Sequence, residues 1–188
     1  MSVKRTSTAS RGRAVSPVSD YLKGFTLFHP QDSEVYCIAY GSNLNEERMK
    51  KRCPKAEPFG TSVIHGYRLL FKQSMTGAYA TIEQDANCCV PVLIYKMTAD
   101  DEQKLDRFEG YPSYYYKQDM AVTMTDLDGK NPQEITAIVY LMNDGHPIRT
   151  PMKGYYDTLE EGYTRFGFNT HLLELAFEEA MEVEHGLC

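Results

Sequence analysis

The segment best suited to bind a charged ligand is a five-residue turn made of Tyr40, Gly41, Ser42, Asn43 and Leu44. It follows residues 35–40 (VYCIAY), a β-branched and aromatic run that is too short for a helix and indicates a buried strand. Asn43, three residues before Glu46, gives a capping-box-like start to a helix that we expect to reach Arg52. The N–H groups at a helix start attract anions, so the turn is a candidate carboxylate or phosphate site. A capped turn that merely joins strand to helix is the alternative.

A carboxyl group suited to proton transfer is predicted at Glu109. The pattern indicates a helix that is capped by Thr98 and ends at Gly110. Glu109 is then the last helical residue, where the helix dipole disfavours an anion, and burial would disfavour it further. A glutamate in that position can exchange protons near neutral pH. The alternative is an exposed glutamate paired with Arg107 or Lys104.

The elements that must position these residues are short strands with helices at their margins. Besides the strand at 35–40, we predict strands at 61–72, 78–82, 89–97, 114–125 and 134–142. The last two are joined by a turn at 126–130, and a final amphipathic helix is expected over 169–184. Strands grouped in this way favour an α+β fold over alternating βαβ units.

Composition restricts the class of protein. The chain has 188 residues, of which 42% are hydrophobic and 24% charged, as expected of one globular domain with a real core. Its formal net charge is −6, and its basic residues form no stripe, which argues against nucleic acid as the main partner. No apolar stretch approaches the length of a membrane span, so we predict no membrane partner.

The five cysteines form no C-x-x-C pair and leave an odd count, as in a reduced, cytoplasmic chain. The five histidines lack metal-ligand spacing, so we predict no metal site.

Residues 1–34 differ from the remainder of the chain. The first twenty residues are rich in Ser, Thr, Arg and Val and lack apolar periodicity, so we predict a flexible N-terminal extension over 1–34 and a folded domain over 35–188. The Arg and Ser bias is similar to that of an organellar transit peptide, and a simply disordered leader is the alternative.

Several separated segments together resemble one family. In chain order they are Ala39 to Leu44, Arg48-Met49 through Arg52-Cys53-Pro54, Gly66 to Leu69, Leu105 to Gly110, and Pro151 with Tyr155 before a helical tail containing Gly162. Each segment is weak alone, but their order and spacing from Val35 onward resemble the γ-glutamylcyclotransferase-like (AIG2-like) family.

The resemblance implies a mixed sheet that curls into a small closed β-barrel flanked by helices, with one pocket at its mouth. It implies that the turn Tyr40 to Leu44 holds the α-amino acid head of a γ-glutamyl substrate, that Glu109 is the general acid/base, and that Tyr155 contributes to the pocket. Neither cofactor nor metal is implied. Met152 stands where the family has a serine, which leaves the polar contribution of that stretch open.

The implied reaction is attack of the α-amino group of a γ-glutamyl amide on its own γ-carbonyl, which releases 5-oxoproline and a free amine. Intramolecular attack supplies its own proximity and needs no external nucleophile. A non-catalytic module that binds an amino-acid-like ligand is one alternative. Another is a different transferase or amidase that uses Cys37 or Cys53. Ser42 has no histidine near it in the sequence, so we expect it to bind ligand rather than attack. The sequence leaves the γ-glutamyl compound and the oligomeric state open.

Overall fold

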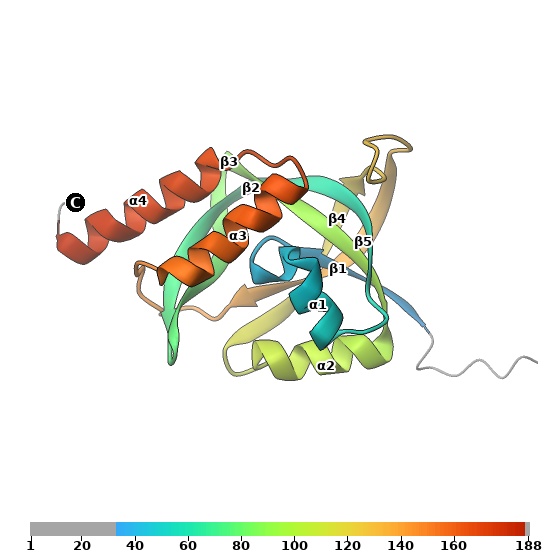
Figure 1. Cartoon of the computed structure of the whole chain (residues 1–188), viewed down its shortest axis with the longest axis horizontal. Coiled ribbons are helices and arrows are strands. Elements are labelled where there is room, and N and C mark those ends of the chain that lie inside the picture. The colour runs from blue at the N-terminus through green and yellow to red at the C-terminus, as the bar shows by residue number, and fades with distance from the viewer. Residues whose placement is uncertain (1–32, 187–188) are drawn as a thin grey trace, which may run out of the picture.

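Figure 1 shows a strongly curved sheet with helices packed around it, in a computed structural model that describes residues 33–186. The strands are β1 (Glu34–Ala39), β2 (Glu57–Ser74), β3 (Gly77–Thr98), β4 (Tyr115–Met124) and β5 (Gln133–Met142). The helices are α1 (Glu46–Arg52), α2 (Ala99–Glu109), α3 (Lys153–Arg165) and α4 (His171–His185), and a 3₁₀ turn, η2 (Ser42–Leu44), precedes α1.

The sheet is mixed, with β1 near its centre. The strand order is β2-β3-β1-β5-β4, and every pair is antiparallel except β1 with β5, where Cys37 lies opposite Ile138. Because β1 has neighbours on both sides, its second half is fully buried from Cys37 to Ala39. The predicted α+β class, with a mixed sheet and flanking helices, is confirmed.

The predicted closure into a barrel is wrong. Strands β2 and β4 are the two edges of the sheet, and they meet in one isolated bridge between Thr61 and Thr125, with both N···O distances at 2.9 Å. Gly60 permits this approach, because a Cβ there would lie 2.2 Å from the Thr125 carbonyl oxygen. Beyond the bridge a groove separates β2 from β4, and its lining includes Phe168. Next to this bridge the Ser62 hydroxyl donates to the Thr123 carbonyl oxygen at 2.7 Å, but the two edges form no continuous ladder.

The two segments predicted as strands at 78–82 and 89–97 form a single strand, β3, paired with β2 along a long hairpin. Pro91 lies inside it, opposite Val63, although proline has no N–H to donate. Strand β1 pairs with β3 only from Leu93 to Thr98, so at Pro91 the missing N–H interrupts no bond to β1. The predicted strands at 114–125 and 134–142 are present as β4 and β5.

The helix after residue 150 starts earlier than the sequence indicated. Tyr155 was expected before a helical tail, whereas it lies in the first turn of α3. Further along α3, Gly162 lies against η2, where a Cβ would be only 2.5 Å from the Cβ of Leu44. The C-terminal helix is present as α4, which buries Leu173, Ala176 and Ala180.

The extension predicted for residues 1–34 lies almost wholly outside the described residues, where only Ser33 and Glu34 belong to it. Within residues 33–186, every helix is too short or too polar to cross a membrane.

The contact between α3 and η2 predicts a contrast between two glycines of one helix. Gly162→Ala should lower the free energy of unfolding by about 1–3 kcal/mol, because the added methyl group overpacks against Leu44. Gly154→Ala is the matched control, since an added Cβ there meets nothing within 4 Å, and it should be neutral or slightly stabilising. Urea denaturation of both variants measures the difference. Equal effects would show that Leu44 does not constrain Gly162.

Candidate active site

A cavity of about 540 Å³ opens between η2, the C-terminal end of α2, the start of β3 and the start of α3. Its lining combines tyrosines, arginines, small turn residues and one carboxylate. The tyrosines are Tyr40, Tyr79, Tyr114, Tyr115, Tyr140 and Tyr155; the arginines are Arg48, Arg52 and Arg107; and the carboxylate is Glu109.

Asn43 has a different role from the one predicted. Asn45, not Asn43, caps α1, because the Asn45 side chain accepts a hydrogen bond from the Arg48 N–H at 3.0 Å. The 3₁₀ turn explains the shift, since Leu44 N–H is already used by Gly41 C=O at 2.9 Å and α1 starts only at Glu46. Freed from capping, the Asn43 amide donates to Oε1 of Glu109 at 2.9 Å.

Four of the five turn residues border the cavity, and the fifth does not. Tyr40, Gly41, Ser42 and Asn43 line it, whereas the Leu44 side chain is fully buried beneath α3. A Cβ on Gly41 would lie 3.2 Å from that of Ala80, so a larger residue would crowd the wall formed by β3. The turn therefore contributes backbone and short polar groups to the cavity, and Leu44 anchors it.

Glu109 is the only acid in the described lining of the cavity. Burial raises the pKa of its carboxyl group above the ordinary value, and the hydrogen bond from Asn43 and the positive charge of Arg52 offset part of that rise. The carboxyl group is not paired with Lys104, whose ammonium binds Asp100 and Asp101 instead. The Glu109 carboxyl group therefore keeps its proton to a higher pH than an exposed glutamate would, which is the environment of a candidate proton carrier.

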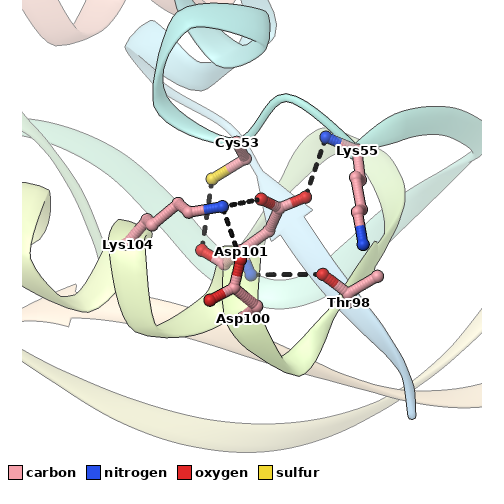
Figure 2. A network of polar contacts seen from close by, with 6 residues as sticks. All are labelled: Cys53, Lys55, Thr98, Asp100, Asp101 and Lys104. Carbon is pink, nitrogen blue, oxygen red and sulfur yellow. Dashed lines mark hydrogen bonds and ion pairs between the residues drawn. The ribbon is translucent and has the colours of Figure 1, made fainter. Parts of the chain in front are cut away.

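The position of Glu109 depends on α2, which is anchored at both ends. At its C-terminal end, Gly110 adopts the left-handed conformation with φ +67°, as predicted. At its N-terminal end, Thr98 caps the helix, and the fully buried Asp101 accepts hydrogen bonds from Lys55 N–H at 2.9 Å and from Lys104 at 3.0 Å. Figure 2 shows this network, which ties α2 to the turn after α1.

Tyr155 and Tyr115 hold the β3 wall of the cavity. The Tyr155 hydroxyl accepts a hydrogen bond from Ala80 N–H at 3.0 Å, and the Tyr115 hydroxyl donates to the Ala80 carbonyl oxygen at 3.1 Å. Burial raises the pKa of both phenols, so they remain neutral. Tyr40 is likewise buried and donates its hydroxyl to the Tyr140 carbonyl oxygen.

The thiols are poorly placed for nucleophilic chemistry. Cys37 and Cys53 are fully buried, and neither lines the cavity. Burial raises the pKa of Cys37 well above its ordinary value and that of Cys53 to about 12, which keeps both thiols protonated. The lining contributed by residues 33–186 contains no histidine that could activate Ser42, and the Ser42 hydroxyl oxygen accepts a hydrogen bond from Arg52 at 3.3 Å. Those residues also hold no cluster of metal-ligating side chains.

The main site residues that sequence reasoning missed are the arginines. Arg48 and Arg52 lie one helical turn apart on α1, and Arg107 comes from α2. The i,i+4 spacing of the first two puts them on one face of the helix, and this was the available signal. That this face borders the cavity follows only from the packing of α1 against α2.

The fold and the cavity together define an α+β protein with a small-molecule site built around one buried glutamate. The chain belongs to the γ-glutamyl cyclotransferase, AIG2-like family, whose sequence model matches residues 37–163. The resemblance stated from the sequence is thereby confirmed.

Individual relatives agree with this assignment. A γ-glutamylcyclotransferase from Homo sapiens is 32% identical over 122 residues, and one from Bos taurus is 34% identical over 122 residues. Each match covers 61% of this chain and 63% of the relative, so the chain spans slightly less than two thirds of their length. A solved structure described as a γ-glutamyl cyclotransferase superposes with a TM-score of 0.66 at 28% identity, covering 77% of this chain and 86% of that one.

The raised pKa of Glu109 predicts a pH-dependent effect of Glu109→Gln on stability. An acid whose pKa is raised by folding stabilises the fold below its unfolded pKa, and this stabilisation is lost as pH rises through the folded pKa. The neutral isostere keeps the carbonyl that accepts from Asn43 but never ionises. Its Tm should therefore exceed that of the wild type at pH 8 and approach it near pH 4. Thermal denaturation across this range is the measurement, and a Tm difference that does not vary with pH would contradict the raised pKa.

Proposed function

We propose that this protein is a γ-glutamyl cyclotransferase, which cleaves a γ-glutamyl amide to 5-oxoproline and a free amine or amino acid, with Glu109 as general acid/base. One observation above all carries the proposal: in a chain of this family, the cavity lining contributed by residues 33–186 holds a single carboxyl group, which is largely desolvated and accepts a hydrogen bond from a neutral amide.

The proposed reaction begins with a proton transfer. The α-ammonium group of the substrate, with an ordinary pKa of about 7.7–8.0, gives a proton to the Glu109 carboxylate and becomes a nucleophile. Its nitrogen attacks the γ-carbonyl carbon, and a carbon–nitrogen bond closes the five-membered ring. This intramolecular attack needs neither an enzyme nucleophile nor a metal.

Collapse of the tetrahedral intermediate needs the same carboxyl group in the opposite role. Protonated Glu109 gives its proton to the leaving nitrogen, the original amide bond breaks, and the amine departs. The carboxylate then takes the second proton from the ring nitrogen and passes it to the amine. Two protons leave the attacking nitrogen and two reach the leaving nitrogen, so the reaction balances without a co-reactant. A raised pKa suits Glu109 to both directions of transfer.

The η2 turn is proposed to hold the amino acid head of the substrate. Gly41, Ser42 and Asn43 line the cavity beside Glu109, and their backbone N–H groups are the proposed donors. Such groups can bind the α-carboxylate or steady the oxyanion that develops at the γ-carbonyl. Tyr155 is proposed to shape the same pocket from α3.

The charges at the cavity favour an anionic leaving group. Within residues 33–186, the arginines that make no ion pair with a carboxylate within 4.0 Å are Arg48, Arg52 and Arg107, and all three line the cavity. Against one glutamate, they leave the site with an excess of positive charge in a chain whose net charge is −6. A γ-glutamyl-amino acid, which retains a carboxylate on the leaving amine, matches this field better than a γ-glutamyl-amine.

A matched pair of substrates tests this preference. γ-Glutamyl-alanine and γ-glutamyl-ethylamine differ only in the carboxylate of the leaving amine, and we expect the first to have the higher kcat/KM. Arg107→Met should reduce that ratio by about threefold to tenfold, mainly through KM for γ-glutamyl-alanine, because one cationic contact is lost. Arg149→Met is the control, since Arg149 pairs with Glu184 and does not line the cavity. A ratio that Arg107→Met leaves unchanged would remove this arginine from substrate selection.

Release of 5-oxoproline tests the proposed function itself. Wild type and Glu109→Gln should be compared on glutathione, several γ-glutamyl-amino acids and ε-(γ-glutamyl)lysine. Turnover is expected for at least one substrate in the wild type, with a loss of about 10²-fold or more in the variant, because the proton carrier is gone. Residual activity above about a tenth of wild type would exclude Glu109 as the acid/base. A wild type silent on every γ-glutamyl compound would favour a binding module instead.

A further inference from the structure

Arg52 joins the two segments that carry the site. It is the last residue of α1, and its guanidinium group lies 3.4 Å from the centroid of the Phe108 ring, the neighbour of Glu109 on α2. From this stacked position it donates hydrogen bonds to Oδ1 of Asn43 and to the hydroxyl oxygen of Ser42. The network around Asp101 fixes the turn that follows Arg52 to the same helix α2 (Figure 2).

The chemistry of these groups determines which way the Asn43 amide faces. A guanidinium group has only donors, so Arg52 must bond to the carbonyl oxygen of the Asn43 amide and not to its NH₂ group. The NH₂ group is then directed to Oε1 of Glu109, at 2.9 Å. If the amide were rotated by half a turn, its NH₂ group would face the N–H donors of Arg52, and its carbonyl oxygen would face the carboxyl oxygen of Glu109. Arg52 therefore removes the ambiguity that an asparagine amide otherwise has.

The same logic assigns the proton on Glu109. The NH₂ group of Asn43 has only donors, so Oε1 must accept in both protonation states of the carboxyl group. The carbonyl oxygen of a neutral carboxyl group is a better acceptor than its hydroxyl oxygen, so the bond from Asn43 favours the carbonyl at Oε1 and the proton on Oε2.

We propose that Arg52 is a positioning residue, which locks the Asn43 amide with its NH₂ group toward Glu109 and so confines the transferable proton of Glu109 to Oε2. The use of that proton in ring closure rests on the proposed function, whereas the lock itself does not. Arg52 needs no contact with the reacting atoms, because it acts through Asn43.

The other groups around Glu109 do not replace this lock. Four tyrosines reach the cavity from the residue after β1 and from β4, β5 and α3, and burial keeps their hydroxyls protonated; they are Tyr40, Tyr115, Tyr140 and Tyr155. Cys37 and Cys53 are buried thiols whose pKa is raised first by burial and further by the charge of Glu109, so both are also neutral. The remaining cations in the lining are Arg48 of α1 and Arg107 of α2, and both side chains are exposed to solvent.

A double-mutant cycle on the titration of Glu109 tests the lock. Protein labelled with ¹³C at glutamate side-chain carboxyls is titrated by NMR, and the Glu109 signal is assigned by its loss in Glu109→Gln. Arg52→Met and Asn43→Ala should each raise the pKa of Glu109 by about one unit, because Asn43→Ala removes the donor to the carboxylate and Arg52→Met removes the group that directs this donor together with a nearby positive charge. The double variant should raise it by clearly less than the sum, since Arg52 acts through Asn43. An unchanged pKa in Arg52→Met, or shifts that add in full, would overturn the proposal.

Two further variants separate the positioning role of Arg52 from a simple effect of its charge. Arg52→Lys keeps the positive charge but loses the planar group held over Phe108, so its shorter side chain no longer holds a donor at the Asn43 carbonyl oxygen, and the pKa of Glu109 should still rise; a wild-type titration there would show that the stacked guanidinium group is not required and would contradict its role as the lock. This variant also provides the test if Arg52→Met fails to fold. Arg68→Met removes an arginine that pairs with Glu179 away from the cavity, and it should leave the titration unchanged.

Failure of the two proposals can be told apart. If the wild type releases no 5-oxoproline, the proposed function fails while the titration still reports on the lock. If turnover is present but the cycle is additive, the lock alone fails.

Discussion

The partly buried hydrogen bond between the Glu109 carboxyl group and the Asn43 amide is the interaction on which the site depends. It joins the end of α2 to the turn after β1, two segments 66 residues apart in the chain. Burial works against the charged form of Glu109, and a single neutral donor with one cation restores only part of what water would supply. The net result is a carboxyl group whose pKa lies above its ordinary value.

Much of the remaining structure keeps that contact in place. Helix α2 is held at both ends: Asp101 in its first turn accepts a hydrogen bond from Lys55 N–H, and Gly110 ends the helix directly after Glu109. The η2 turn is held from above by α3, which approaches it closely through Gly162. The β2–β3 hairpin curves round to supply the opposite wall (Figure 1), where two tyrosine hydroxyls engage both backbone groups of Ala80. These phenols are kept neutral by burial, and Glu109 is the one acid in the described lining, with a pKa raised above its ordinary value.

Local signals predicted the elements better than their connections. The Thr98 cap and the Gly110 stop located α2 correctly, because capping depends on neighbouring residues. The barrel prediction failed, since closure depends on how β2 and β4 approach, and their backbones pair in a single isolated bridge between Thr61 and Thr125. Asn43 was mistaken for the cap because the 3₁₀ turn delays the helix to Glu46, a choice set by tertiary packing. Arg52 was missed for the same reason: its partners come from a distant helix. The roles proposed for Glu109, the turn and Tyr155 remain predictions.

The central claim is that one buried carboxyl group moves the protons of the reaction, and the pH dependence of kcat/KM tests it most directly. The free enzyme must hold Glu109 ionised to accept the first proton, so the acid limb reports its pKa. The account predicts that the pKa of the acid limb of the kcat/KM profile lies above the ordinary glutamate value of 4.5 and coincides with the pKa of Glu109 measured by NMR. A kcat/KM that stays constant as pH falls through that titration would contradict the account, because the proton acceptor would then be another group.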